Sequence, residues 1–268
     1  MKYTNYFLNK KEYNESICDQ VQDSLNYYKE TKEFYFFDEN ENKTESYIIA
    51  TYNVTSTTSN TRLLSSSFIL SQIIEMYVDD VKLDNVVNTY TFNNIGKHEI
   101  KFKCDKCIQQ ITNCDYMFYG CSGLTSIEFS DNFDTSNVTD MSYMFYGCSG
   151  LTSLNVSSFN TSKVTSMYAM FQRCYNLTSL DLSNFDTSKV TTMFQMFTTC
   201  SGLTSIEFGY YSDVSKVTSS GAIFSNVPSS CTLTLCNNTV NSWNKIISSY
   251  TLNTVYIDCI DPSLETNE

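Results

Sequence analysis

A unit of 26 or 27 residues recurs almost four times between Met117 and Phe208, and this repetition constrains the fold more than any other feature. The copies begin at Met117, Met144, Met170 and Met196, and a degenerate copy begins at Ile223. One unit of this size buries its apolar side only against stacked neighbours. The period therefore predicts a solenoid that is leucine-rich-repeat-like, mainly β and supplemented by short helices.

Each unit contains an alternating apolar segment that reads as a strand. These segments occupy 100–102, 127–129, 154–156, 180–182, 206–208 and 233–235. Their spacing predicts successive rungs of one ladder that begins at Ile100. An aromatic residue follows each strand, at Phe133, Phe159, Phe185 and Tyr211. Spacings of three and four around the Met-Phe pairs then predict a short helical return on the opposite side.

The chain around the repeats divides into three further segments. Residues 1–46 form an N-terminal segment with a helix at 9–31, whose apolar stripe contains Tyr13, Ile17, Val21 and Leu25. This stripe either packs on its own chain or attaches the protein to a larger assembly or a second copy. Residues 47–98 read as a small antiparallel β module with a hairpin turn at Asp79-Asp80. The solenoid covers 99–236, and 237–268 forms a C-terminal cap.

Charge and hydropathy exclude several classes of partner. The net charge of −12 opposes nucleic-acid binding, which needs a clustered basic face. No stretch approaches the 18 or more apolar residues of a membrane-spanning helix. The first residues lack the apolar core of a secretory signal, so we expect none.

The repeats resemble the BspA-like leucine-rich repeat family. The resemblance rests on FDTSNVTDMSYMFYGCSGLTSLNV-type units, which occur here from Phe133 and as FDTSKVTTMFQMFTTCSGLTSIEF from Phe185. The segment from Tyr47 to Phe102 also resembles the β module that precedes such repeats in proteins of gut anaerobes and their phages.

This resemblance implies a surface-displayed recognition or adhesion module without a cofactor. Members on bacterial surfaces usually carry a secretion signal or an anchor. We therefore expect a phage virion component, such as a head or tail fibre or a decoration protein, that assembles in the host cytoplasm. A bacterial adhesin that binds a glycan or a protein is the alternative, and a carbohydrate-active enzyme is a third hypothesis.

The cysteines suggest two kinds of site. Cys121, Cys148, Cys174 and Cys200 hold one repeat position, where small buried residues packing from rung to rung explain them better than reactive thiols. Cys104, Cys107, Cys114 and Cys121 form the best zinc candidate, but only one close-spaced pair is present and two of the four have packing roles. We therefore expect no metal.

Catalysis has little support in the sequence. His98 is the only histidine and has no patterned nucleophile beside it, and the carboxylates Glu128, Asp131, Asp134 and Asp140 read as solvated surface. The candidate binding residues are instead aromatic. They flank the Met-Phe pairs of two adjacent units at Tyr116, Tyr119, Tyr143 and Tyr146, and they either contact a sugar or protein partner or simply stack between units.

Overall fold

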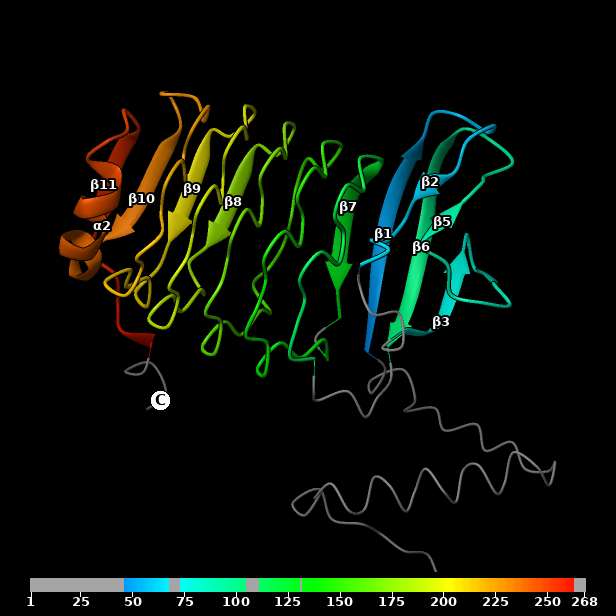
Figure 1. The fold of residues 1–268 in the computed structure, drawn as a ribbon, viewed down its shortest axis with the longest axis horizontal. Coiled ribbons are helices and arrows are strands. Elements are labelled where there is room, and N and C mark those ends of the chain that lie inside the picture. The colour runs from blue at the N-terminus through cyan, green and yellow to red at the C-terminus, as the bar shows by residue number, and fades with distance from the viewer. Residues whose placement is uncertain (1–45, 68–72, 105–110, 131, 263–268) are drawn as a thin grey trace, which may run out of the picture. The chain divides into compact units, whose positions relative to one another are not determined.

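The computed structural model describes residues 46–67, 73–104, 111–130 and 132–262, all of which lie in one compact unit, Thr44–Glu268. The unit is mainly β, as the sequence predicts, and its described part contains one short α-helix and one 3₁₀ turn. Figure 1 shows the strands side by side from β3 to β11. The predicted helix at 9–31 lies outside the described residues.

The first sheet has the strand order β4-β3-β6-β1-β7. Its members are β1 (Ser46–Val54), β3 (Ile73–Val78), β4 (Val81–Lys82), β6 (Gly96–Cys104) and β7 (Leu124–Phe129). The short strands β2 (Thr61–Arg62) and β5 (Thr89–Tyr90) pair separately. Asp79 and Asp80 form the predicted hairpin turn between β3 and β4, with φ of 48° and 64°.

The prediction that the ladder of repeat strands begins at Ile100 is wrong. The Ile100 segment does not stack directly on the Ile127 segment, because β1 is antiparallel to both β6 and β7 and lies between them. Ala50 of β1 is opposite Ile100 on one side and Ile127 on the other. The predicted boundary at residues 98 and 99 also lies inside β6.

Successive repeats lie beside one another in parallel. Their strand segments include β8 (Ser179–Leu182), β9 (Ser205–Phe208) and β10 (Thr232–Cys236), and β11 (Asn253–Ile257) ends this second sheet. Residues 151–156 occupy the same place between β7 and β8 but are not a regular strand. Single parallel bridges along the other side join Asn113, Asp140, Ser166, Thr192 and Ser219 in sequence.

The predicted helical return around each Met-Phe pair is wrong. In the first unit Met117, Tyr119 and Cys121 donate their N–H groups within the unit, whereas Tyr116 and Phe118 donate to carbonyls of the next unit. A helix would direct every N–H to its own turn. Left-handed φ values near 57° at Tyr116 and at its equivalents also break helical geometry.

The conserved spacing inside each unit produces columns of identical side chains. The phenyl rings of Phe118, Phe145, Phe171, Phe197 and Phe224 stack with centroids 5.4–5.8 Å apart, and all five side chains are buried.

The Asp-Thr-Ser segments stabilise a turn and link it to the next unit. In one unit Asp186 Oδ1 accepts from the Ser188 N–H at 2.9 Å, and the Thr187 hydroxyl donates to the Asp213 carbonyl at 2.8 Å.

The C-terminal cap contains η3 (Asn237–Thr239), α2 (Val240–Ile247) and β11. The prediction that Tyr211 continues the aromatic column of Phe185 is wrong, because Tyr211 is exposed. Ser212 holds the equivalent position, and buried Trp243 of α2 contacts Phe208 and donates its indole N–H to the Ser212 carbonyl at 2.8 Å. A disulfide joins Cys236 to Cys259 beside this cap.

Candidate functional site

Six aromatic side chains form a continuous row along the Met-Phe side of the repeats, which we call the aromatic ladder. Tyr116 stacks on Tyr143 with ring centroids 4.7 Å apart, and Tyr119 stacks on Tyr146 at 4.6 Å. The row continues from Tyr143 to Tyr168 at 5.0 Å and from Tyr168 to Phe194 at 5.3 Å. The ladder thus comprises Tyr116, Tyr119, Tyr143, Tyr146, Tyr168 and Phe194.

The structure brings together all four predicted tyrosines and adds two residues that the repeat alignment missed. Tyr168 and Phe194 lie two positions before their methionines, whereas Tyr116 and Tyr143 lie one position before theirs. In the third unit Ala169, at that nearer position, is buried. A search for aromatic residues at either position would have found the longer row.

The geometry of the ladder determines which ring atoms are free. The stacked pairs are nearly parallel, with interplanar angles of 21° and 7°. Each inner ring therefore covers a face of its neighbour, and the Arg173 guanidinium lies 5.6 Å from the Tyr146 ring. Where two rings are stacked, the ladder therefore offers ring edges rather than open faces.

The hydroxyls of Tyr116 and Tyr143 remain protonated at neutral pH, because the pKa of each is raised. Partial burial, followed by the nearby Asp115 carboxylate, raises the pKa of Tyr116 above its usual value. Burial and the hydrogen bond with Tyr168 raise the pKa of Tyr143 further. These side chains can both donate and accept hydrogen bonds at physiological pH.

The cysteine column is a packing element. Cys148, Cys174 and Cys200 are fully buried, and each thiol donates to the carbonyl of a phenylalanine one unit back, at 3.1, 3.1 and 2.9 Å. Burial raises the pKa of Cys121 and of Cys200 to about 12. Thiolates are the reactive form, so the packing interpretation explains this column better than the reactive-thiol alternative.

The predicted zinc candidate is only partly visible. Cys104, Cys114 and Cys121 are buried, whereas Cys107 lies outside the described residues. Among the residues that the structure describes, no group of three or more His, Cys, Asp or Glu is arranged to hold a metal ion. The attachment stripe of Tyr13, Ile17, Val21 and Leu25 also lies outside the described residues.

The carboxylates of the first unit take part in turns. Asp134 Oδ1 accepts from the Ser136 N–H at 2.8 Å, and Asp140 Oδ1 accepts from the Ser142 N–H at 2.8 Å. Asp131 lies outside the described residues. These two bonds are the local Asx turns that aspartate forms at chain reversals.

His98 also has structural partners. Its Nδ1 lies 2.6 Å from Asp79 Oδ2 and its Nε2 lies 3.1 Å from the Asn94 carbonyl oxygen. Each ring nitrogen therefore lies within hydrogen-bond distance of an oxygen atom. The pair holds the β3–β4 turn against β6.

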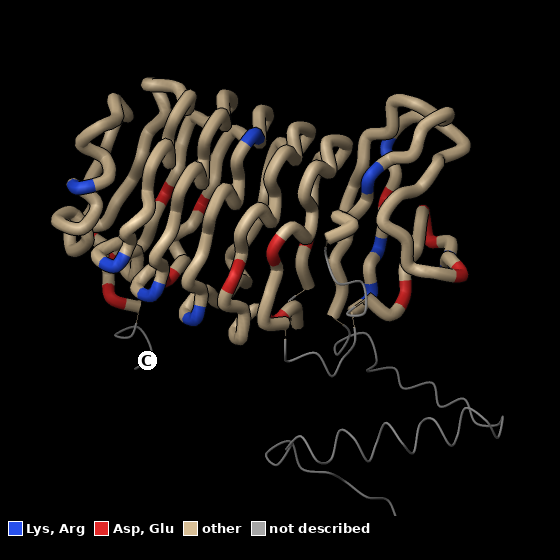
Figure 2. The backbone as a smooth tube through the Cα atoms, in the orientation of Figure 1, with Lys and Arg blue, Asp and Glu red and all other residues tan. Residues whose placement is uncertain are grey.

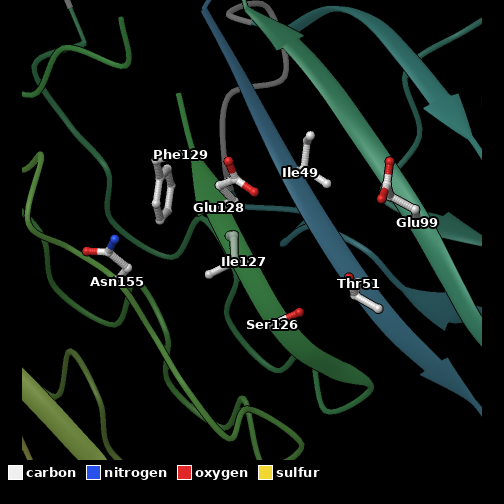
Figure 3. Close-up of a pocket in the computed structure, with 8 residues that line it drawn as sticks. All are labelled: Ile49, Thr51, Glu99, Ser126, Ile127, Glu128, Phe129 and Asn155. Carbon is white, nitrogen blue, oxygen red and sulfur yellow. The ribbon is translucent and has the colours of Figure 1, made fainter. Parts of the chain in front are cut away.

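A second candidate site is a hollow on the outer face of the first sheet, which the sequence did not reveal. Its lining comes from β1, β6, β7 and the irregular segment beyond them, and it encloses about 500 Å³. Figure 3 shows Glu128 of β7 beside Ile49 of β1, with Glu99 on the far side of β1. Glu99 and Glu128 are the only ionisable residues among the eight that line this hollow.

Few charged residues lie at the candidate sites: Glu99 and Glu128 line the hollow, and Asp115 and Arg173 lie beside the ladder. In Figure 2 acidic and basic residues are scattered along the repeats, and long stretches of backbone carry neither. No helix in the described part of the chain is long and apolar enough to span a membrane.

Comparison with known proteins locates one match. Residues 112–243, which contain the repeats, match a family model described as "Mycoplasma protein of unknown function, DUF285". No curated protein and no solved structure matches this chain.

Proposed function

We propose that this chain is a non-catalytic recognition protein whose repeats form a leucine-rich-repeat-like solenoid of the BspA-like kind. The parallel bridges and the hydrogen bonds between positions 26 or 27 residues apart support the solenoid. A scaffold of this type holds surface side chains at a regular spacing and contributes an extended binding surface.

The aromatic ladder is the observation that carries the proposal, and a protein is the partner that it fits best. A sugar ring usually packs on an open aromatic face, and the inner faces of this ladder are covered by neighbouring rings. The tyrosine ring edges suit a protein surface, because tyrosine and arginine contribute much of the binding energy at protein interfaces. Arg173 lies at the border of the ladder.

Two settings are consistent with this activity. The first is the surface of a phage virion, where the chain contacts host or virion proteins. The second is a bacterial cell surface; the matching family model is described from Mycoplasma, a bacterium, and this supports a bacterial origin. The Cys236–Cys259 disulfide supports either exposed location, because disulfides persist mainly outside the reducing cytoplasm.

Site-specific photocrosslinking in the producing cells tests the proposal. Benzoylphenylalanine is placed at Tyr119 in one variant and at Tyr175, an exposed tyrosine outside the ladder, in a matched control. We expect the Tyr119 position to yield a discrete protein adduct that the Tyr175 position does not. Mass spectrometry of that adduct separates the two settings, because it identifies either a virion protein or a cell-surface protein.

Other outcomes would overturn the proposal. Equal adducts from both positions, or none above background, would remove the ladder as a protein-binding surface. A glycan array and a hydrolysis assay address the remaining hypotheses. Glycan binding that is lost in Tyr119→Ala would replace the protein partner with a sugar, and turnover that is lost in Asp134→Ala would replace recognition with catalysis.

A further inference from the structure

Strand β11 is the outermost strand of the second sheet and pairs with β10 alone among the described residues. Figure 1 shows it at one end of the row of strands. The Cys236–Cys259 disulfide links the chain just after β11 to the end of β10. The outer edge of β11 is therefore held in an extended and ready-made geometry.

The backbone groups on this edge can be assigned from the pairing with β10. The Asn253 N–H donates to the Cys231 carbonyl at 3.2 Å, so Asn253 faces β10. Successive residues of a strand point their backbone groups to opposite sides. Val255 consequently also faces β10, whereas Thr254 and Tyr256 present their N–H and C=O groups to the free edge.

The side chains of β11 are uncharged, and three of the five are largely apolar. Val255, Tyr256 and Ile257 are 40%, 37% and 37% exposed, and the sequence Asn253–Ile257 contains no charged residue. Proteins commonly protect exposed edges with short strands, charges, prolines or bulges. Strand β11 has none of these devices.

The opposite edge of the structure shows the contrast. Strand β4 has only two residues, Val81–Lys82, and the Lys82 ammonium forms an ion pair with Glu75 at 2.5 Å. A short, charged edge resists pairing with another chain. One end of this protein is therefore protected and the other is open.

We propose that β11 is a dimerisation edge that pairs antiparallel with β11 of a second copy of this chain, about a two-fold axis at Val255. With Val255 opposite its own equivalent, all five strand residues overlap. This register places Thr254 opposite Tyr256 of the other copy, so the four free backbone groups on each strand form hydrogen-bonded pairs. A two-fold interface uses the same patch on both copies, as this edge allows.

Charge favours this edge over other surfaces for a second copy. Each chain carries a net charge of −12, so two copies repel one another over most of their surface. The five residues of β11 add no charge to that repulsion. A single strand pair lies at the small end of the interface range, below about 1,200 Å², so association is weak and reversible.

Sedimentation velocity of the whole chain tests the proposal between about 1 and about 200 μM, a range chosen for a weak interface. We expect the sedimenting mass to rise toward twice the monomer mass with concentration. Thr254→Pro removes one N–H from the free edge but none from the β10 pairing, and proline is tolerated on edge strands. We expect this variant to remain folded and monomeric across the range. A parent chain that stays monomeric, or a folded Thr254→Pro chain that still dimerises, would overturn the proposal.

Disulfide trapping tests the register. In a non-hydrogen-bonded pair the two Cα atoms at position 255 lie about 4.5 Å apart, within the range of a disulfide. We expect Val255→Cys to give a covalent dimer under mild oxidation. Ile257→Cys is the matched control, because its two copies are about 13 Å apart along the strands. Equal trapping of both variants, or none of Val255→Cys above the parent chain, would contradict the assigned register.

Discussion

Replacing Leu151 tests how the repeats are held together. Its side chain has no exposed surface, and Leu124 and Leu177 hold the same position in the units on either side and are also buried. Leu151→Ala removes buried methyl groups and leaves a cavity, which costs about 3 kcal/mol. Leu151→Asp adds the cost of a buried polar group without a partner, about 2 kcal/mol or more.

The total of about 5 kcal/mol for Leu151→Asp approaches the whole stability of a typical domain. We therefore expect Leu151→Ala to fold with a clearly lower urea midpoint and Leu151→Asp to lose its structure. Far-UV circular dichroism reports the whole chain in these experiments. Fluorescence of Trp243, the only tryptophan, reports the C-terminal cap.

Ser153→Asp is the matched control, because it adds the same charge two residues away at an exposed position. We expect its free energy of unfolding to stay within about 0.5 kcal/mol of that of the parent chain, as for most surface substitutions. Equal midpoints for Leu151→Ala, Ser153→Asp and the parent would refute the assigned packing of this column.

Three further predictions concern Arg173, the cysteine column and Asp79. Arg173 has φ of 64° where Gly120 and Gly147 occupy equivalent positions, so Arg173→Gly should raise stability in urea by about 0.5–1 kcal/mol. Cys148, Cys174 and Cys200 should resist a thiol reagent until urea unfolds the chain, because they are buried and their pKa values are raised; rapid labelling of the native protein would contradict this. Burial alone would raise the pKa of Asp79, but hydrogen bonds from His98 and from the Glu99 N–H outweigh it and hold the pKa below 3.8. The folded form therefore binds this proton less readily than the unfolded form, and its contribution to stability is lost as the pH falls below about 3.8. Asp79→Asn should lower stability at neutral pH and flatten the acid limb of the urea midpoint plotted against pH.

Much of the fold was predictable because the repeat period specifies neighbours directly. When units of equal length stack in parallel, residues one period apart become adjacent, and this rule predicted the burial of the cysteine column. The short helix around the Met-Phe pairs was predicted wrongly. Spacings of three and four also fit turns whose alternate N–H groups bond to the next unit, as they do from Tyr116 to Cys121.

The aromatic ladder was also predictable only in part. The positions of Tyr116, Tyr119, Tyr143 and Tyr146 followed from the alignment of units, and stacking between units was one of the two interpretations. Their contact with Tyr168 and Phe194 did not follow, because those residues lie one position earlier in their units. Only the structure shows that neighbouring rings of the ladder cover each other's inner faces.

By itself the sequence determined the local and periodic features: the β-rich units, the buried columns, the Asp79-Asp80 turn and the polar surface. The tertiary structure decided the contacts between segments that no period relates. Strand β1 lies between β6 and β7, Trp243 takes the place beside Ser212, and β11 leaves an open edge. The physical reason is that such contacts depend on which distant segment fills a given space, and each segment taken alone is compatible with several neighbours.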